Sequence, residues 1–533
     1  MREATPLSQN NRLSIDILFT LILLAYAVLG WFLVWHIPYT FPFGGPDELM
    51  HLSMADYIAK HLAWPQWDST EVVRNAYGVS YSSGGSMVYW LHGLSYRLFG
   101  EHRIGAFILL LLYLALSIWA YRKNTIAGFL MLAGMLPQTL FIFSYVNSDG
   151  GTIITALLLG MSVGFYVTGE RKPAHFMLFF FFAGLAVTAR QHLWAIAFLT
   201  FVWTLVYTRR TWLNYPKKFW LFALLLALLP ASWWFITSYL ANAGDILGVF
   251  INAKSIAKFG DPDLPSLARA WSDIQLSDFL PATLVSLYGS FGWTSLPLKP
   301  YEYFSAAAVI IAITILLYRK IDKPLFFFFV LLVSANLGFM LVYSTFYDYQ
   351  PQGRYLFPSI YIVLGMITTI AIEKKLFSKL LLALLILLSL QNVYFSTKLS
   401  LFSYVDDLLE KPTRLAALPS KKYALALHHI DRLKVVDDKL FLKGWIFDRQ
   451  AGKPFPVTKL ILLKDGQAYA ITLEKRERPD VAAAFQNPAL DMAGVGADMI
   501  GVKQLPRGIY DVMFMVTVNG EPQVIPLEET VKL

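Results

Sequence analysis

Long runs of apolar residues constrain this chain more than any other feature of its sequence. A helix needs about 20 consecutive apolar residues to cross the roughly 30 Å hydrocarbon core of a bilayer. About eleven such spans are expected, at residues 14–36, 104–121, 126–146, 152–168, 175–189, 193–208, 218–238, 302–318, 324–346, 356–372 and 380–396. The sequence therefore predicts a polytopic α-helical membrane protein.

Composition agrees with this class. Of the 533 residues, 56% are hydrophobic and only 15% are charged, whereas soluble domains carry about 25% charged residues. The net charge of +9 does not indicate nucleic-acid binding, because the basic residues gather in short loops between apolar runs. The chain has no cysteine, which excludes disulfides and thiolate metal sites.

Some spans allow more than one interpretation. The short pair on either side of Arg190 could form a broken or re-entrant unit, and residues 85–99 could form an interfacial helix or part of a further span. The first span lacks a small-residue cleavage site after it, so we expect a retained anchor rather than a removed signal peptide.

The basic residues also predict an orientation. They fall in alternate loops, as Arg122, Lys123, Arg171, Lys172, Arg209, Arg210, Lys217, Lys218, Arg319, Lys320, Lys323, Lys374, Lys375 and Lys379. Loops rich in Lys and Arg remain cytoplasmic, so the N-terminus is expected on the cytoplasmic side of an inner membrane. The large loops 37–103 and 241–300 and all residues after 397 are then expected outside.

The sequence changes character after the last span. Residues 1–397 form the expected membrane domain, residues 398–424 a polar linker, helical to about residue 422, and residues 425–533 a small β-sandwich. Period-2 runs in this last part are separated by Asp465-Gly466 and Asn519-Gly520, which are strong hairpin signals. We interpret Gly444-Trp445 and Arg478-Pro479-Asp480 there as packing and turn residues.

The best pointer to chemistry is the run Pro46-Asp47-Glu48-Leu49-Met50-His51 in the first outer loop. Proline suits the first position of a helix, and carboxylates there complement the helix dipole. On a helix from about 46 to 62, His51 lies four residues after Asp47 and three after Glu48, so all three can project toward one region. The alternative is a charged first turn that merely caps the helix.

The same loop carries aromatic and glycine residues suited to sugar faces and to close approach of the backbone. They are Gly44, Gly45, Trp64, Trp67, Tyr77, Tyr81, Gly84, Gly85, Tyr89 and Trp90. Aromatic residues also belong to interfacial belts, so they support a sugar site without establishing one.

A divalent metal ion is an alternative role for the acidic run. Asp-Glu-x-x-His resembles the metalloprotease signature with its first histidine replaced by aspartate. Asp47 and His51 could still bind an ion, with Asp149 or Glu48 completing an oxygen-rich shell. We expect no cofactor, and this metal site remains an open alternative.

Three further outward clusters carry charge. Asp149 lies in a tight turn between two spans, where capping the following helix is the alternative role. Arg190 with His192, and Arg354 in Gln352-Gly353-Arg354-Tyr355, place positive charge at the membrane edge. Guanidinium groups there suit phosphate recognition, although snorkelling to lipid headgroups would explain them as well. Together these residues describe a site for an anionic, lipid-linked substrate.

These motifs carry a family resemblance over nearly the whole chain. Pro-Asp-Glu-x-x-His, Asn147-Ser148-Asp149, Gly184-Leu185-Ala186 leading into Arg190, Ser290-Phe291-Gly292-Trp293 and Gln352 to Pro358 together resemble the bacterial DUF2142 membrane family. That family is itself similar to the GT-C glycosyltransferases, including the protein O-mannosyltransferase and aminoarabinose transferase branches. The terminal β-sandwich also resembles tails that accompany such proteins.

The resemblance implies an inverting glycosyltransferase that moves a sugar from a polyprenyl-phosphate carrier to a glycan, lipid or protein acceptor on the outer face. It implies Asp47 as general base, with Glu48 or His51 tuning its pKa or orienting the substrate. Arg190, where relatives often carry lysine, and Arg354 would bind the phosphate. Asp149, His192, Gln352 and Tyr355 are the further expected substrate-binding residues.

Two other classes remain open at this stage. A transporter for lipid-linked saccharide would also use outward arginines and aromatic residues, but it should show broken or polar spans near the midplane. A non-catalytic partner in polysaccharide assembly or export could use the β-sandwich for docking.

Overall fold

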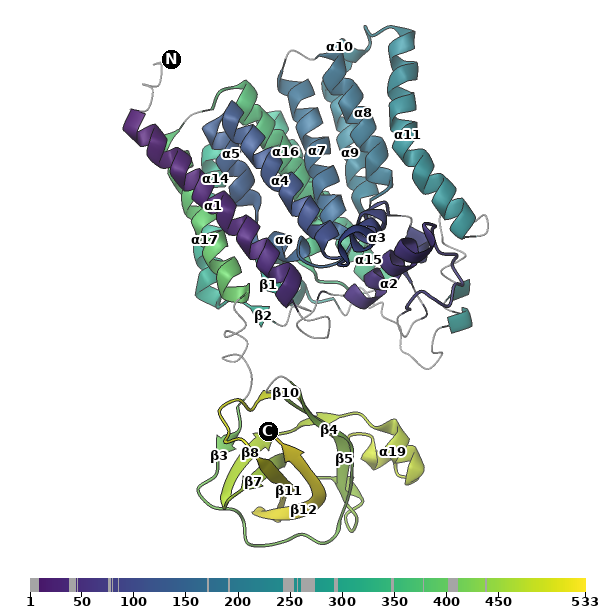
Figure 1. The fold of residues 1–533 in the computed structure, drawn as a ribbon, viewed down its shortest axis with the longest axis vertical. Coiled ribbons are helices and arrows are strands. Elements are labelled where there is room, and N and C mark those ends of the chain that lie inside the picture. The colour runs from purple at the N-terminus through teal and green to yellow at the C-terminus, as the bar shows by residue number, and fades with distance from the viewer. Residues whose placement is uncertain are drawn as a thin grey trace. The chain divides into compact units, whose positions relative to one another are not determined.

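The structure is a computed structural model of the 533-residue chain, and Figure 1 shows its ribbon. The described residues are 9–37, 45, 47–74, 78, 80–84, 86–169, 172–189, 192–242, 254–255, 257–259, 274–291, 296–346, 349–376, 378–400, 411–436 and 439–533. The chain divides into two compact units, Met1–Leu401 and Phe402–Leu533.

The first unit is helical (Figure 1). Its α-helices are α1 (Gln9–His36), α2 (Glu48–His61), α3 (Val88–Phe99), α4 (Ile104–Lys123), α5 (Thr125–Gly134), α6 (Pro137–Ile142), α7 (Asp149–Thr168), α8 (Pro173–Val187), α9 (His192–Tyr207), α10 (Arg209–Trp212), α11 (Lys217–Ala241), α13 (Leu276–Tyr288), α14 (Pro300–Tyr318), α15 (Lys323–Phe346), α16 (Phe357–Glu373) and α17 (Lys379–Ser400). Two 3-10 turns, η1 (Tyr81–Gly84) and η3 (Gly353–Leu356), and a short pair of strands, β1 (Ser290–Phe291) and β2 (Leu296–Pro297), complete it.

The helices confirm a polytopic membrane protein. Within the described residues, eight helical segments are long and apolar enough to cross a bilayer, namely those formed by α1, α4, α7, α11, α14, α15, α16 with η3, and α17. Three further apolar helices, α5, α8 and α9, are shorter. Each expected span thus contains a helix, but the number of crossings stays a prediction.

The expectation of one continuous span at 126–146 is wrong, because the chain breaks there into α5 and α6. Pro137 lacks an N–H group and begins a new helix. The carbonyls at the end of α5 find side-chain donors instead: Tyr113 donates to Met131, Asn392 to Ala133, Tyr361 to Gly134 and Tyr26 to Met135, at 2.8–3.2 Å. Such substitution is how a helix break is tolerated at membrane depth.

Helices α7 and α16 pack backbone to backbone. A Cβ at Gly160 of α7 would lie 2.1 Å from the Ile362 carbonyl oxygen of α16, and one at Gly365 would lie 2.3 Å from the Leu157 carbonyl oxygen. Small residues at a helix interface permit this approach in membranes. Because both helices start at the same end of the bundle (Figure 1), their N-terminal residues are brought together.

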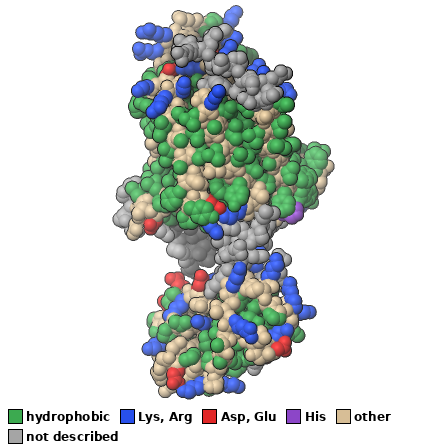
Figure 2. Space-filling model, turned by 90° about the vertical axis from the view of Figure 1, so that its left-hand side faces the viewer, with side chains coloured by type: hydrophobic (Ala, Val, Ile, Leu, Met, Phe, Trp, Pro, Cys, Tyr) green, Lys and Arg blue, Asp and Glu red, His purple; other side chains and the backbone are tan. Residues whose placement is uncertain are grey.

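Lys and Arg side chains gather at the other end of the helical unit, above a broad apolar belt (Figure 2). Lys374, after α16, pairs there with Asp322, before α15, at 2.9 Å. This distribution agrees with the alternate basic loops seen in the sequence. The side of the membrane on which this end lies stays a prediction.

The second unit contains two antiparallel sheets. Its strands are β3 (Thr413–Arg414), β4 (Ala426–Val436), β5 (Lys439–Asp448), β6 (Lys453–Pro454), β7 (Thr458–Lys464), β8 (Gln467–Thr472), β9 (Glu474–Arg476), β10 (Gly494–Gly501), β11 (Ile509–Val518) and β12 (Glu521–Lys532), with a short helix α19 (Pro479–Ala484) and a 3-10 turn η4 (Pro488–Leu490). The strand orders are β4-β5-β10-β9, with β6 beside β5, and β12-β11-β7-β8-β3.

The hairpin expectations in this unit are confirmed. Asp465 and Gly466 have φ of 49° and 74° between β7 and β8, and Asn519 and Gly520 have φ of 51° and 83° between β11 and β12. These positive φ angles are those that a two-residue hairpin turn requires.

Residues 401–410 of the expected linker at 398–424 lie outside the described residues. On either side of them, α17 continues to Ser400, and Thr413–Arg414 form β3 beside β8 where a helix was expected. Leu415 and Leu418 pack against Ile461. Burial of these leucines explains why this segment joins the sheet, and the contact cannot be seen from local sequence.

Candidate functional site

Helix α2 begins one residue after Asp47. Asp47 is the N-cap with φ 57°, and its carbonyl accepts the amides of Met50 and His51. The helix expected from about 46 to 62 is thus observed as Glu48–His61, and Pro46 itself lies outside the described residues. Aspartate tolerates the left-handed conformation better than most residues. The turn fixes the direction in which the Asp47 side chain leaves the backbone.

The Asp47 carboxylate meets groups from two distant segments. The Tyr81 hydroxyl of η1 donates to its Oδ2 at 3.1 Å, and Nη2 of Arg354 in η3 lies 4.0 Å from the same oxygen. The side chain is 28% exposed, so water or a substrate can reach it. This combination of a fixed orientation and partial exposure suits a group that exchanges protons.

Arg354 lies between two carboxylates. Its Nη1 is 3.8 Å from Oδ2 of Asp149 and 3.4 Å from the Tyr145 hydroxyl, and its guanidinium lies over the Tyr355 ring. The Arg354 and Asp149 side chains are 5% and 4% exposed. The predicted convergence of Asp47, Asp149 and Arg354 is therefore present in the structure.

Close packing holds η3 in place. The Gly353 amide donates to Ser286 Oγ of α13 at 2.7 Å, and a Cβ at Gly353 would lie 2.2 Å from the Leu287 nitrogen. A side chain at this position would push η3 away from α13. The Gln352-Gly353-Arg354 sequence thus has a physical reason for its glycine, which is to place Arg354.

Asp149 is the first residue of α7 and not its N-cap. Ser148 occupies the N-cap position, and Asn147 Oδ1 accepts the Gly150 amide at 3.0 Å. The Asn147 amide group donates to the carbonyls of Ile142 and Tyr145. The capping explanation for Asp149 is therefore wrong, since Asn147 makes the side-chain bond to the first turn.

Glu48 has a different environment from Asp47. Its two oxygens accept Nε and Nη2 of Arg103, each at 2.7 Å, and Oε1 also accepts the Val146 amide at 3.0 Å. The side chains of Glu48 and Arg103 are 0% and 1% exposed. The expectation that Glu48 projects with Asp47 into an outward site is wrong, because this buried pair engages both of its oxygens.

The Glu48–Arg103 pair joins four segments. Nη1 of Arg103 donates to the carbonyls of Val34 and Ile37 at the end of α1, and Arg103 itself is the N-cap of α4. Together with the Val146 amide, these bonds fix α1, α2, α4 and the turn before α7. Glu48 therefore positions its neighbour Asp47 and the loop that precedes Asp149.

His51 is fully buried among aromatic rings. Its imidazole stacks on the Tyr81 ring, with centroids 4.1 Å apart and an interplanar angle of 6°. Its Nδ1 is 2.6 Å from the Tyr89 hydroxyl. These contacts stack His51 against Tyr81, and its expected catalytic role stays a prediction.

The remaining expected site residues are less defined. Arg190 lies outside the described residues, and His192 begins α9 but its side chain is not described. Their roles stay predictions. Gln352 and Tyr355 are half-buried beside Arg354. No group of three His, Asp or Glu side chains able to hold a metal ion occurs within the described ranges.

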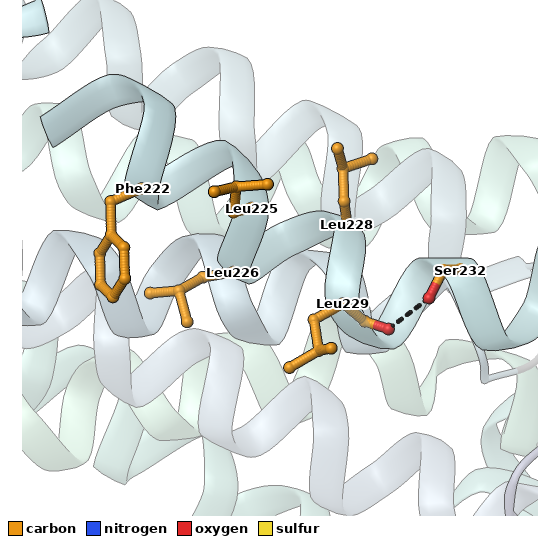
Figure 3. A pocket seen from close by; sticks show the side chains of 6 residues that line it. All are labelled: Phe222, Leu225, Leu226, Leu228, Leu229 and Ser232. Atoms are coloured by element: carbon orange, nitrogen blue, oxygen red, sulfur yellow. Dashed lines mark hydrogen bonds between the residues drawn. The ribbon is translucent and has the colours of Figure 1, made fainter. Parts of the chain in front are cut away.

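Two apolar grooves lie elsewhere, on the helices. One of about 410 Å³ runs along α11 between Phe222 and Ser232 (Figure 3). The other, of about 200 Å³, is lined by α8 and α9 between Ala183 and Phe201. Neither groove is lined by an ionisable residue. Such apolar grooves suit contact with hydrocarbon, and they lack the charged groups that Asp47 and Arg354 provide.

Sequence reasoning missed the aromatic and basic partners of the site. Tyr81 and Tyr89 were noted only as members of an aromatic loop, and Arg103 and Tyr145 were not singled out. Arg103 directly precedes an apolar span, where a single arginine offers a signal, but Glu48 is 55 residues away from it in sequence.

Fold and site together define a multi-pass membrane protein with a cluster of carboxylates, an arginine and tyrosines at one end of its helical bundle. The DUF2142 family model, described as a predicted membrane protein, matches residues 86–363, which is more than half of the chain. The chain belongs to the DUF2142 family.

Two solved structures are similar to this chain. Both are of ArnT from Cupriavidus metallidurans: one bound to undecaprenyl phosphate, with 16% identity and a TM-score of 0.44, and one in the apo state, with 17% identity and a TM-score of 0.43. Each alignment covers 66% of this chain and 59% of that chain, so this chain spans about three fifths of ArnT's length. No match is found among the curated proteins.

Proposed function

We propose that this protein is a membrane glycosyltransferase that moves a sugar from a polyprenyl-phosphate donor to a cell-envelope acceptor outside the cytoplasm. The observation that carries the proposal is the placement of Arg354 between Asp47 and Asp149, with Asp47 partly exposed. A base and a phosphate ligand side by side are the two groups that this reaction needs.

The chemistry follows from these two groups. Asp47 takes the proton of an acceptor hydroxyl as that oxygen bonds to the anomeric carbon, while the bond from this carbon to the phosphate oxygen breaks. The leaving group is the polyprenyl phosphate, whose developing charge Arg354 stabilises. Positioned general-base catalysis contributes about 10²–10⁴ in rate. No nucleotide takes part.

The distances around Arg354 support a role with an anion. Charge-assisted bonds between arginine and carboxylate are about 2.7–2.9 Å long, as between Arg103 and Glu48. The 3.8 and 4.0 Å separations from Asp149 and Asp47 exceed that range. The two carboxylates orient Arg354 electrostatically, and in this proposal the donor phosphate binds its guanidinium. Arg190 is the second phosphate ligand in this proposal.

Mass spectrometry of cell-surface glycans tests the function. A strain lacking the gene should lose one glycosyl modification, and the wild-type gene should restore it. An unchanged set of envelope glycans in the deletion strain would contradict a transferase. If the export of a polymer changes in that strain instead, the result would favour a transporter or an assembly partner.

Binding of undecaprenyl phosphate to the purified protein tests the phosphate ligand. Arg354→Gln should weaken binding at least tenfold, since it removes a charged hydrogen-bond donor worth about 1.5–3 kcal/mol. Arg97→Gln, an exposed arginine at the end of α3, is the matched control and should bind as the wild type. Equal binding by all three proteins would refute the role of Arg354.

A further inference from the structure

The two oxygens of the Asp47 carboxylate have different environments. Oδ2 accepts the Tyr81 hydroxyl at 3.1 Å and faces Arg354 Nη2 at 4.0 Å. Among the described residues, no hydrogen bond reaches Oδ1. In the described part of the chain, Oδ2 therefore has two protein partners and Oδ1 has none.

Tyr81 is itself held by its surroundings. Its ring stacks on His51, which is buried and lies 2.6 Å from the Tyr89 hydroxyl. Tyr89 packs with Met54 and Ile58 of α2 in a small apolar cluster. The stack on His51 and the packing against this cluster hold the Tyr81 ring so that its hydroxyl reaches Asp47.

The adjacent residues fix η1 as well. Trp64 donates from Nε1 to the Ser82 carbonyl at 2.7 Å, and Ser80 and Ser82 bond to each other through their hydroxyls. Because α2 carries both Asp47 and His51, the base and the support of Tyr81 move as one unit. The Tyr81–Asp47 bond thus closes a rigid arrangement in which every member is anchored.

We propose that Tyr81 is a positioning residue that holds Asp47 by Oδ2, so that Oδ1 is the atom that accepts the proton of the acceptor hydroxyl. This inference rests on the proposed function and names the atom that performs its proton transfer. Without the Tyr81 hydroxyl, the carboxylate can turn about its Cβ–Cγ bond. The base would then meet the acceptor in the right geometry for only part of the time.

The same geometry defines the role of His51. Its side chain contacts Tyr81 and Tyr89, and its backbone amide donates to the Asp47 carbonyl. In this inference His51 supports the ring of Tyr81.

The variant Tyr81→Phe tests the inference, since it removes the hydroxyl and keeps the stacked ring. The matched control is Tyr57→Phe, in the second half of α2, whose hydroxyl makes no hydrogen bond among the described residues. Both variants are expressed in the deletion strain. The measurements are the initial rate at which the lost glycan reappears after induction, and the affinity of the purified proteins for undecaprenyl phosphate.

Tyr81→Phe should slow the reappearance about 10- to 100-fold, as expected for loss of a hydrogen bond to a charged group. Its affinity for undecaprenyl phosphate should stay within twofold of the wild-type affinity. Its midpoint of thermal unfolding should stay within a few degrees of the wild-type midpoint. Tyr57→Phe should match the wild type in all three. This split separates a positioning role from a merely structural one, which would lower stability and affinity together.

Other outcomes refute the inference separately from the function. A full rate for Tyr81→Phe, in a strain where Asp47→Asn is inactive, would overturn the role of Tyr81 and leave the glycosyltransferase standing. Weaker undecaprenyl phosphate binding at an unchanged rate would make Tyr81 a donor-binding residue, which also overturns it. If the deletion strain loses no glycan, the proposed function fails instead.

Discussion

Glu48 and Arg103 form a bidentate ion pair in which both bonds are 2.7 Å long and neither side chain is more than 1% exposed. The pair connects α2, which follows Asp47, to the C-terminus of α1 and the N-terminus of α4. Breaking such a pair leaves an uncompensated buried charge. Removing one partner of this pair therefore tests what holds the site in place, independently of the reaction that the site performs.

Arg103→Ala should destabilise the protein by about 3–5 kcal/mol, seen as a lower midpoint of thermal unfolding in detergent. Lys60→Ala is the control, because Lys60 pairs with Glu71 at an exposed position where ion pairs contribute about 0–1 kcal/mol. Similar midpoints for the two variants would show that the buried pair does not stabilise the fold.

Two glycines offer a matched test of helix packing. Gly160→Ala should lower the unfolding midpoint, because its Cβ would lie 2.1 Å from the Ile362 carbonyl oxygen and force α7 and α16 apart. Gly338→Ala in α15, with nothing within 4 Å, should leave the midpoint unchanged or raise it, since alanine favours helix by about 1 kcal/mol. The opposite order of midpoints would contradict the close packing of α7 and α16.

Orientation can be tested by cysteine labelling, because the chain has no cysteine of its own. Ala63→Cys, an exposed position after α2, should react with a membrane-impermeant maleimide in intact spheroplasts. Asn214→Cys, exposed at the basic end between α10 and α11, should react only after lysis. Labelling of Asn214→Cys alone in intact spheroplasts would place the site on the cytoplasmic side and refute the proposed topology.

The helices of the membrane unit could be predicted because crossing a bilayer demands long apolar runs, which are visible locally. The break between α5 and α6 carried a local signal in Gly134 and Pro137, but the side chains that make the break tolerable, such as Asn392, come from distant helices. In the second unit, Asp465-Gly466 indicated a hairpin, because the turn needs a positive φ at both positions and few residue types adopt one.

The charged residues of the site could be predicted from the sequence, but the residues that they contact could not. Asp47, Asp149 and Arg354 stood out because charge at a membrane edge is costly unless it is paired or solvated. Which carboxylate pairs with which arginine depends on contacts between distant residues. Glu48 and Asp47 look alike in sequence, but one is buried against Arg103 and the other is partly exposed beside Tyr81.

The most direct measurement of the central claim compares Asp47→Asn with the wild type in the deletion strain and in purified form. Asparagine also tolerates the left-handed backbone of this position, so the fold should persist. We predict that the glycan stays absent from the cell surface while undecaprenyl phosphate still binds with wild-type affinity. Restoration of the glycan by Asp47→Asn would show that Asp47 is not the base.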